Sequence, residues 1–327
     1  MEATIHASSF QLESPAAEFR IPTVEGHLMD VTRQVRHILT SAQNRNGCFG
    51  DLKNVGFKWN RPVSYSNPFI QAYYTLKYYG DFMDEYCAVY DNICRFLSSE
   101  PEVSVLSLGC GSCVDFSALL YAHSPGQKIS YRGVDVVNWR IRPDFEFYPY
   151  SFTQANVANI TDIDPFTNVI FFPRSISDFD AKSFDALLRI LGSFQMHTAK
   201  LALAIGYTSH ASFLERDAAR FSRVLNCFVR RGFHIHPDDY ARVRQYRTCE
   251  SLKTGWGEQW RKSGVFEEFA HICEELIANC PNQKANNECC GNACHDLRAA
   301  ASLVHDTKWQ VIRLSCDLHC PAIVPLA

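Results

Sequence analysis

The sequence has no long hydrophobic run and no excess of charge of one sign. No apolar stretch approaches the roughly 20 residues that a membrane helix needs. The formal net charge is −3, from 32 Lys and Arg against 35 Asp and Glu, so the whole chain lacks the electrostatic signature of a protein that binds nucleic acid or anionic lipid. The net charge does not exclude a local basic patch on the surface. The first residues show no basic segment followed by an apolar run, so we expect no secretory signal and a cytoplasmic protein.

The composition is that of a soluble globular protein. Hydrophobic residues make up 46% and charged residues 20% of the 327 residues. A chain of this length buries one large core, with or without a smaller attached unit.

Cysteine is frequent, with 14 copies. For a chain of this length without a secretory signal, reduced thiols or a metal site are expected before disulfides. Cys280, Cys289, Cys290, Cys294 and His295 fall within sixteen residues. The four cysteines are candidate ligands of a structural zinc, although they lack the paired Cys-x-x-Cys spacing of zinc ribbons. Disulfides and free thiols remain the alternatives.

The N-terminal third is expected to be a mainly helical cap, residues 1–97, with one helix near 29–41. From 67 to 96 apolar residues, many of them aromatic, recur at helical spacing, and Gly80 is predicted to divide this stretch into two helices. The aromatic side chains form either a core seam or a lid over a pocket. In the second case Tyr73 is a candidate to face the reacting groups.

The middle of the chain alternates between predicted strands and predicted helices, which implies βαβ units and a parallel sheet. Strands are expected at 103–108, 128–137, 147–155, 168–172 and 200–207, and helices at 113–123, 180–196 and 213–231. We therefore predict an α/β fold with a doubly wound, mostly parallel, seven-stranded sheet. Its core spans 98–236, an insertion with a helix near 266–279 spans 237–304, and a last strand at 309–314 lies within 305–327.

One segment of this alternation predicts a ligand site. The apolar run Val103–Leu108 is typical of a strand buried on both faces. Gly109 and Gly111 then permit a tight turn and a close approach of a ligand to the backbone. The next strand ends at Asp135, where a carboxylate is suited to bind ribose hydroxyls. Strand, turn, helix and terminal acid together predict a nucleotide-type cofactor.

Here the chain resembles the class I S-adenosylmethionine-dependent methyltransferases, whose first motif stands as Leu106-Ser-Leu-Gly-Cys-Gly-Ser-Cys113. The resemblance covers about 100–236 and 308–315. It implies S-adenosylmethionine as cofactor, ribose binding by Asp135, and adenine contacts near Asn156 and Val157. The cofactor-binding residues it implies are Gly109, Cys110, Gly111, Asp115, Asp135, Asn156, Val157 and Phe172.

Two positions depart from the family pattern. Ser107 stands where many members carry an acid, which leaves the cofactor's ammonium group without an obvious partner, and Asp115 is the candidate. Cys113 stands where a third glycine would be, which argues against a dinucleotide because its pyrophosphate needs that glycine. An NAD-type oxidoreductase and a non-catalytic Rossmann-like binding partner remain the alternatives.

The substrate side is less defined, because methyl transfer mainly requires the reacting atoms to be held close and aligned. The fourth strand is followed by Phe172-Pro-Arg-Ser175 and not by the Asn/Asp-Pro-Pro-aromatic signature of base and glutamine methyltransferases. Arg174 and Ser177 are further candidate catalytic residues, although Ser177 also suits a helix start. A small-molecule substrate is favoured over RNA or protein, and the sequence does not indicate an oligomeric state.

Two other patterns each have a functional and a purely structural interpretation. His234 and His236 are expected on one face of a short strand, where they are either metal ligands or surface histidines. The basic, aromatic stretch 240–262 is suited to contacts with nucleic acid, or is a solvated amphipathic segment.

Overall fold

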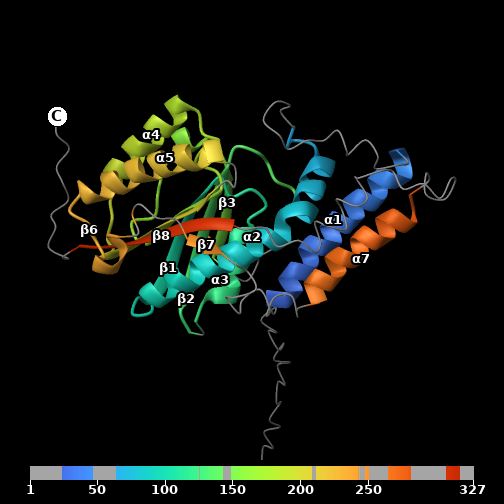
Figure 1. Cartoon of the computed structure of the whole chain (residues 1–327), viewed down its shortest axis with the longest axis horizontal. Helices are drawn as coiled ribbons and strands as arrows, with labels where there is room; N and C mark the ends of the chain where they lie inside the picture. Colours follow the sequence, from blue (N-terminus) through green and yellow to red (C-terminus); the bar gives the residue numbers. More distant parts are fainter. Residues whose placement is uncertain are drawn as a thin grey trace, which may run out of the picture.

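A computed structural model describes the parts of the chain on which the following account rests. The described residues are 24–46, 64–124, 126–142, 149–207, 211–241, 243, 247–249, 264–280 and 307–316. They form a twisted sheet with helices on both faces and a helical unit beyond one end of it (Figure 1). None of the described helices has the length and apolar character needed to cross a membrane.

The sheet has the order β3-β2-β1-β4-β5-β8-β6, with a short β7 that pairs with β8. The first five strands in this order are parallel, and β8 runs antiparallel to its neighbours. The strands are β1 Glu102–Leu108, β2 Lys128–Asp135, β3 Tyr150–Gln154, β4 Val169–Pro173, β5 Lys200–Tyr207, β6 His234–Ile235, β7 Arg247–Cys249 and β8 Thr307–Ser315. The chain changes direction across the sheet at β1, which lies between β2 and β4. This is the predicted doubly wound, mostly parallel, Rossmann-like sheet, with seven strands along the main order.

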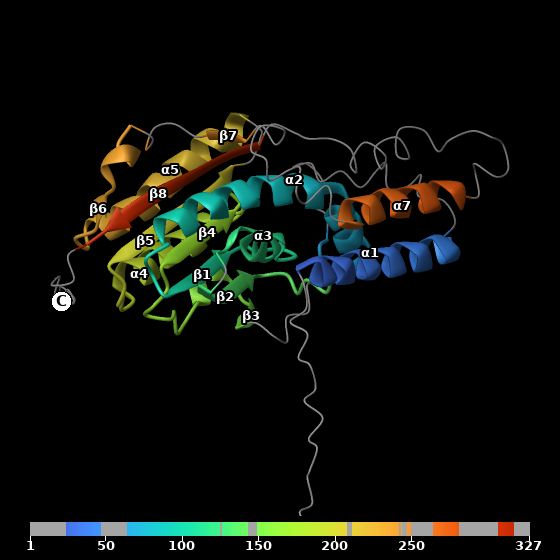
Figure 2. The same ribbon diagram turned by 90° about the horizontal axis from the view of Figure 1, so that it is seen from below.

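Two helical layers bury the two faces of the sheet (Figure 2). The helices are α1 Val24–Asn46, α2 Pro68–Phe96, α3 Val114–Ala122, α4 Ala181–Ser193, α5 Ala211–Val229 and α7 Gly264–Ala278, with short 3-10 turns η2 Val157–Asn159 and η3 Pro237–Asp239. One hydrophobic cluster joins α2 and α3 to the sheet, and a second joins α4 and α5 to its other face. The sheet is therefore the central layer of three.

Helices from the two predicted flanking regions pack against each other. α1 lies beside α7 beyond the end of the sheet (Figure 2). Arg36 of α1 forms ion pairs with Glu268 at 3.0 Å and Glu275 at 2.7 Å. The division into an N-terminal cap and a separate insertion is a division of the sequence, and in space helices of both regions share one unit.

The predicted break at Gly80 is wrong, because α2 is one helix of 29 residues. Its start is defined by Asn67, whose side chain accepts a hydrogen bond from the backbone of Phe69 at 3.0 Å. All residues from Asp81 to Tyr90 are buried. A glycine inside a helix costs only about 1 kcal/mol relative to alanine, which packing on all sides of this segment outweighs.

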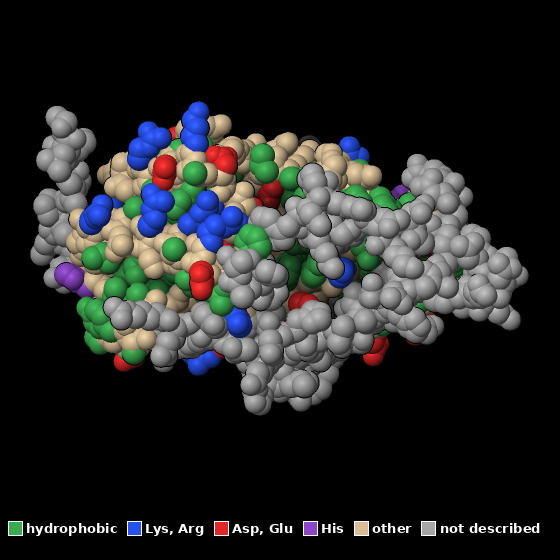
Figure 3. Space-filling model, turned by 45° about the horizontal axis from the view of Figure 1, so that its top comes forward, with side chains coloured by type: hydrophobic (Ala, Val, Ile, Leu, Met, Phe, Trp, Pro, Cys, Tyr) green, Lys and Arg blue, Asp and Glu red, His purple; other side chains and the backbone are tan. Residues whose placement is uncertain are grey.

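Basic side chains gather over the α4–α5 layer on the face shown in Figure 3. Two of the α5 arginines hold neighbouring backbone in place. Arg220 donates to the carbonyls of Ile176 and Phe179 at 2.6 and 2.7 Å, and Arg231 donates to carbonyls at the end of α4. These guanidinium groups therefore stabilise the fold and are engaged within it.

Candidate functional site

The glycine turn lies at the carboxyl end of β1, as predicted. The backbone N–H groups of Gly109 and Cys110 both donate to the carbonyl of Val134 at the end of β2, at 2.7 and 3.2 Å. Gly109 and Gly111 have positive φ angles of 74° and 56°, which glycine adopts without strain. The turn is thereby fixed to the neighbouring strand before α3 begins at Val114.

Gly109 is also required by packing. A Cβ at this position would lie 2.3 Å from Cβ of Ser175, in the segment after β4. The Ser175 hydroxyl donates to the carbonyl of Leu108, the last residue of β1. The segments that follow β1 and β4 are consequently in direct contact.

Asp135 lies where the resemblance places the ribose-binding acid. Its two carboxylate oxygens accept hydrogen bonds from the backbone N–H groups of Gly111 at 2.9 Å and Val137 at 2.8 Å. Burial raises the pKa of Asp135, and these two hydrogen bonds oppose the rise. A carboxylate oxygen accepts more than one hydrogen bond, so Asp135 keeps capacity for ligand hydroxyl groups while it holds the turn.

The predicted adenine pair lies beside this carboxylate. The N–H of Ala155 donates to the carbonyl of Asp135 at 2.9 Å, which brings the end of β3 next to the end of β2. Asn156 caps η2 by accepting from Ala158 at 2.8 Å, and Val157 is buried. The structure therefore brings this pair together with Asp135 and the glycine turn at one edge of the sheet.

Phe172 has a different environment from these residues. Its ring is fully buried in the hydrophobic cluster under α4 and α5, 6.4 Å from the ring of Phe179. We assign it to the core, because its side chain has no surface to offer to a ligand.

Asp115 lies behind the turn, in the first turn of α3, and its side chain is fully buried. Both of its oxygens accept from the Tyr131 hydroxyl at 2.9 Å, and one accepts from Tyr90 at 3.4 Å. Burial raises its pKa to about 6, against the opposing effects of the Ser107 hydroxyl and of Tyr131. Helix α3 thus places a carboxylate beside Ser107, the position at which the family carries an acid on the strand. This carboxylate is enclosed by tyrosines.

The end of β4 carries a buried ion pair. Arg174, with a positive φ of 58°, donates from Nε and Nη2 to Oε2 of Glu85 on α2, the Nε bond being 2.9 Å long. Glu85 is fully buried, and its Oε1 has no hydrogen-bond partner among the described residues. A Cβ at Gly206 on β5 would lie 2.1 Å from that oxygen. Only a glycine at this position leaves room for the carboxylate.

The ion pair changes the pKa of both groups. Burial raises the pKa of Glu85, and Arg174 opposes that rise. Burial also disfavours the Arg174 cation, but Glu85 outweighs burial and raises the pKa of the guanidinium. Arg174 therefore stays charged, with its side chain 17% exposed.

A series of aromatic rings on α2 begins at this cation. The Arg174 guanidinium lies 4.9 Å from the centre of the Phe82 ring, within the range of a cation–π contact. Phe82 stacks on Tyr78 at 5.6 Å and contacts Tyr74 at 6.1 Å. Tyr74 in turn lies 5.6 Å from Trp139, which follows β2. The aromatic face of α2 thus reaches from Arg174 to the region of the glycine turn.

Of the three candidate catalytic residues, only Arg174 belongs to this arrangement. Tyr73 is buried in the hydrophobic cluster that includes residues of α1. Ser177 is buried, and its carbonyl accepts from Arg216 at 2.9 Å. It does not begin α4, whose N-cap is Asp180. The sequence does not indicate Glu85 as a site residue, because a single glutamate in an aromatic helix matches no sequence motif and its partner Arg174 is 89 residues away.

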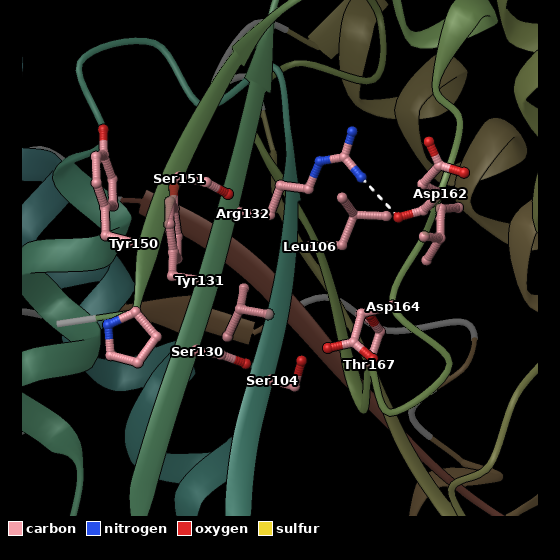
Figure 4. A pocket seen from close by; sticks show the side chains of 13 residues that line it. Ser104, Leu106, Ser130, Tyr131, Arg132, Tyr150, Ser151, Asp162, Asp164 and Thr167 are labelled. Atoms are coloured by element: carbon pink, nitrogen blue, oxygen red, sulfur yellow. Dashed lines mark hydrogen bonds between the residues drawn. The ribbon is translucent and has the colours of Figure 1, made fainter.

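A pocket of about 360 Å³ lies elsewhere, between the middle of β1, β2 and β3 and the loop before β4 (Figure 4). Arg132 crosses this region and donates to the carbonyls of Thr161 and Asp162 at 3.0 and 2.9 Å. Ligands of doubly wound sheets bind beyond the carboxyl ends of the strands. The pocket lies away from that edge, and the glycine turn remains the better candidate.

The described residues give no support to a metal site. No three of their His, Cys, Asp and Glu side chains are grouped to hold an ion. Cys280 is buried after the end of α7, whereas Cys289, Cys290 and Cys294 lie outside the described residues. Near His234 and His236, the buried Asp239 pairs with Arg313 at 2.8 Å, which identifies this acid as part of the fold.

Comparisons with known proteins find similarity of structure only. No protein-family model and no curated protein matches the sequence. Solved structures that resemble the fold include the plantazolicin methyltransferase BpumL in complex with S-adenosylhomocysteine (9% identity, TM-score 0.37, 89% of this chain and 100% of that one). The N-methyltransferase NodS from Bradyrhizobium japonicum WM9 has 10% identity and a TM-score of 0.37, over 72% of this chain and 97% of that one.

The cyclase SpnF is also similar, with 15% identity and a TM-score of 0.37 over 90% of this chain and 96% of that one. The fold of this chain is established by its own strand order, a doubly wound and mostly parallel sheet in which β8 is antiparallel to β5.

Proposed function

We propose that the protein is an S-adenosylmethionine-dependent methyltransferase that acts on a small molecule. The observation that carries this proposal is the glycine turn after β1, tied by Gly111 to the carboxylate of Asp135 at the switch point of the sheet. Helix N-termini and strand ends at such a point present polar groups to a nucleotide-type ligand.

The residues at this edge fit the cofactor. Among the described residues, a Cβ added to Gly111 would meet only the Trp139 ring within 4 Å, at 3.8 Å, so backbone and an aromatic face border the turn. Gly109, Cys110 and Gly111 would hold the amino-acid portion of the cofactor, Asp135 the ribose hydroxyls, and Asn156 and Val157 the adenine. When bound, S-adenosylmethionine supplies an electrophilic methyl group.

We assign the substrate side to the end of β4. Arg174 is partly exposed, stays charged, and lies over the ring of Phe82, which contacts the rings of Tyr78 and Tyr74. In this proposal Arg174 and the rings bind and orient the acceptor, and Glu85 acts as a positioning residue that fixes the guanidinium. Transfer to an acceptor that has no proton to lose needs alignment and no base.

Calorimetry tests the cofactor site directly. The full chain is titrated with S-adenosylmethionine and S-adenosylhomocysteine, together with the variant Asp135→Ala. We expect binding to the unmodified chain and a loss of roughly tenfold or more in the variant, because hydrogen bonds to a charged group contribute about 1.5–3 kcal/mol. Asp185→Ala is the matched control, since Asp185 lies on the exposed face of α4 and pairs with Arg223 of α5.

Two results overturn the proposal. One is a folded chain, as judged by circular dichroism, that binds neither compound. The other is binding of NADH in preference to S-adenosylmethionine, which indicates an oxidoreductase.

A structural zinc held by Cys280, Cys289, Cys290 and Cys294 is a separate proposal, supported by the number and proximity of these thiols in the sequence. Such a site would brace the insertion, because four protein ligands leave no open position for chemistry. Elemental analysis of protein purified without chelator tests it, and less than one zinc per four chains contradicts it.

A further inference from the structure

The glycine turn contains two cysteines whose sulfur atoms are in contact. Cys110 and Cys113 occupy the ends of the sequence Cys110-Gly-Ser-Cys113, and their Sγ atoms are 3.7 Å apart. The N–H of Cys113 donates to the carbonyl of Cys110 at 2.9 Å. This hydrogen bond closes a four-residue turn immediately before α3.

The backbone of this turn already suits a disulfide. A hydrogen-bonded four-residue turn places its first and last Cα atoms less than about 7 Å apart, and a disulfide joins Cα atoms about 4.4–6.8 Å apart. Cys113 keeps a positive φ of 57° as the N-cap of α3. Bond formation can therefore leave β1 and α3 in place and confine the movement to the two side chains and the turn between them.

The two thiols are enclosed by strand and helix. Cys110 is 5% exposed and Cys113 is fully buried. The Cys110 sulfur lies over Gly133 of β2, 2.8 Å from where a Cβ would be, and the Cys113 sulfur lies 3.4 Å from the Tyr150 hydroxyl. Cys110 is the more accessible of the two, so an oxidant small enough to enter the turn reaches it first.

We propose that Cys110 and Cys113 form a redox couple that closes to a disulfide and thereby controls the cofactor turn. The existence of the couple does not depend on the proposed methyltransferase function, whereas the control of cofactor binding rests on it.

The oxidant is a peroxide. The Cys110 thiolate attacks one peroxide oxygen, which forms a sulfenic acid as the O–O bond breaks and hydroxide leaves. The Cys113 sulfur then attacks the Cys110 sulfur, which forms the S–S bond and releases the sulfenic oxygen as water. In sum, two thiols and hydrogen peroxide give one disulfide and two water molecules. A dithiol reductant reverses the change by thiol–disulfide exchange.

Burial sets the rate of this reaction. It raises the pKa of the Cys110 thiol, and the neighbouring Cys113 adds to the rise. The thiolate is the reactive form, so oxidation is slow at neutral pH and accelerates as the pH rises. A pair of this kind responds to sustained oxidation more than to a brief pulse.

The disulfide would alter the contacts of the turn. Gly111, whose N–H binds Asp135, lies inside the ring that the disulfide closes. Drawing the Cys110 sulfur toward Cys113 also removes it from its place over Gly133. We expect the oxidised chain to bind S-adenosylmethionine about fivefold or more weakly, the effect of losing one hydrogen bond.

The test uses the reduced full chain, treated with hydrogen peroxide at pH 7 and at pH 8.5 and then blocked with an alkylating reagent. Trypsin releases both cysteines in one peptide, residues 96–128, which contains no other cysteine. Mass spectrometry should find this peptide unalkylated and lighter by two hydrogen atoms, sooner at the higher pH. Dithiothreitol should restore two alkylatable thiols.

Variants and calorimetry separate the outcomes. Cys110→Ser and Cys113→Ser should abolish the mass change, and Cys94→Ser, which removes a buried thiol of α2, should leave it intact. Two alkylated thiols in the peroxide-treated wild-type peptide overturn the proposal that the two cysteines form a redox couple, whatever the variants show. A disulfide that leaves S-adenosylmethionine affinity unchanged overturns the proposal that the couple controls cofactor binding. A reduced chain that binds no S-adenosylmethionine contradicts the proposed function, while the mass change still decides the couple.

Discussion

Replacing Asp115 with asparagine separates a structural role of this carboxylate from a role in binding the cofactor's ammonium group. The side chain is fully buried against the hydroxyls of Tyr131 and Tyr90, and burial raises its pKa from 3.8 to about 6. The folded chain therefore binds the proton of Asp115 more tightly than the unfolded chain. The resulting stabilisation is complete below about pH 4 and is lost as the pH rises through about 6.

The magnitude follows from the difference in pKa. A difference of about two pKa units corresponds to roughly 3 kcal/mol, so ionised Asp115 costs about that much at pH 8 and roughly half as much at pH 5. Asparagine has nearly the same shape and no charge to bury. The stability of Asp115→Asn relative to the wild type should therefore rise by on the order of 1 kcal/mol between pH 5 and pH 8.

Urea unfolding of both chains at several pH values measures this change. Any loss of hydrogen-bond quality in the amide shifts the difference equally at every pH, so its slope is the diagnostic quantity. Tyr90 and Tyr131, with raised pKa values, stay protonated throughout. A difference that stays flat from pH 5 to pH 8 refutes the reasoning on charge burial. A loss of about tenfold or more in S-adenosylmethionine affinity would show instead that Asp115 binds the cofactor.

Other substitutions test other parts of the site and its frame, each measured by urea denaturation. Gly206→Ala places a methyl group 2.1 Å from Oε1 of Glu85 and should cost about 3 kcal/mol or more by separating the buried ion pair. Gly192→Ala, in α4, places its methyl group more than 4 Å from any described residue beyond its own helix and should gain up to about 1 kcal/mol, and equal effects of the two changes would contradict the assignment. Glu85→Gln leaves a buried guanidinium without its countercharge and should cost about 3–5 kcal/mol, so a neutral result argues against the ion pair. Asp180→Ala removes the acceptor for the N–H of Ser183 at 2.9 Å, and the midpoint of unfolding should shift to a lower urea concentration.

Features that depend on neighbours in the sequence could be predicted. The apolar run of β5 gives both of its ends correctly, at Lys200 and Tyr207. The glycine turn and Asp135 could be connected because consecutive parallel strands end at the same edge, and the hydrogen bond from Gly111 joins them there. Local pattern and the rules of parallel sheets suffice for this half of the site.

Features that depend on distant contacts could not be predicted. The continuity of α2 through Gly80 comes from packing around its second half, which no property of the glycine itself reports. The ion pair of Glu85 and Arg174 joins residues 89 positions apart through a space that exists only because residue 206 is glycine. The enclosure of Asp115 likewise depends on tyrosines from α2 and β2. In each case the deciding partner belongs to another element.

The two halves of the site are mechanically connected. Ser175 packs against Gly109 and donates to the carbonyl of Leu108, and the residue before it is Arg174, which Glu85 holds against α2. The turn proposed for the cofactor and the cation proposed for the substrate are therefore separated by a single contact. Methyl transfer depends on holding donor and acceptor at a fixed distance and angle. Under the proposed function, a sheet that packs the segments after β1 and β4 directly on each other would meet that requirement through its backbone, without a conspicuous set of catalytic side chains.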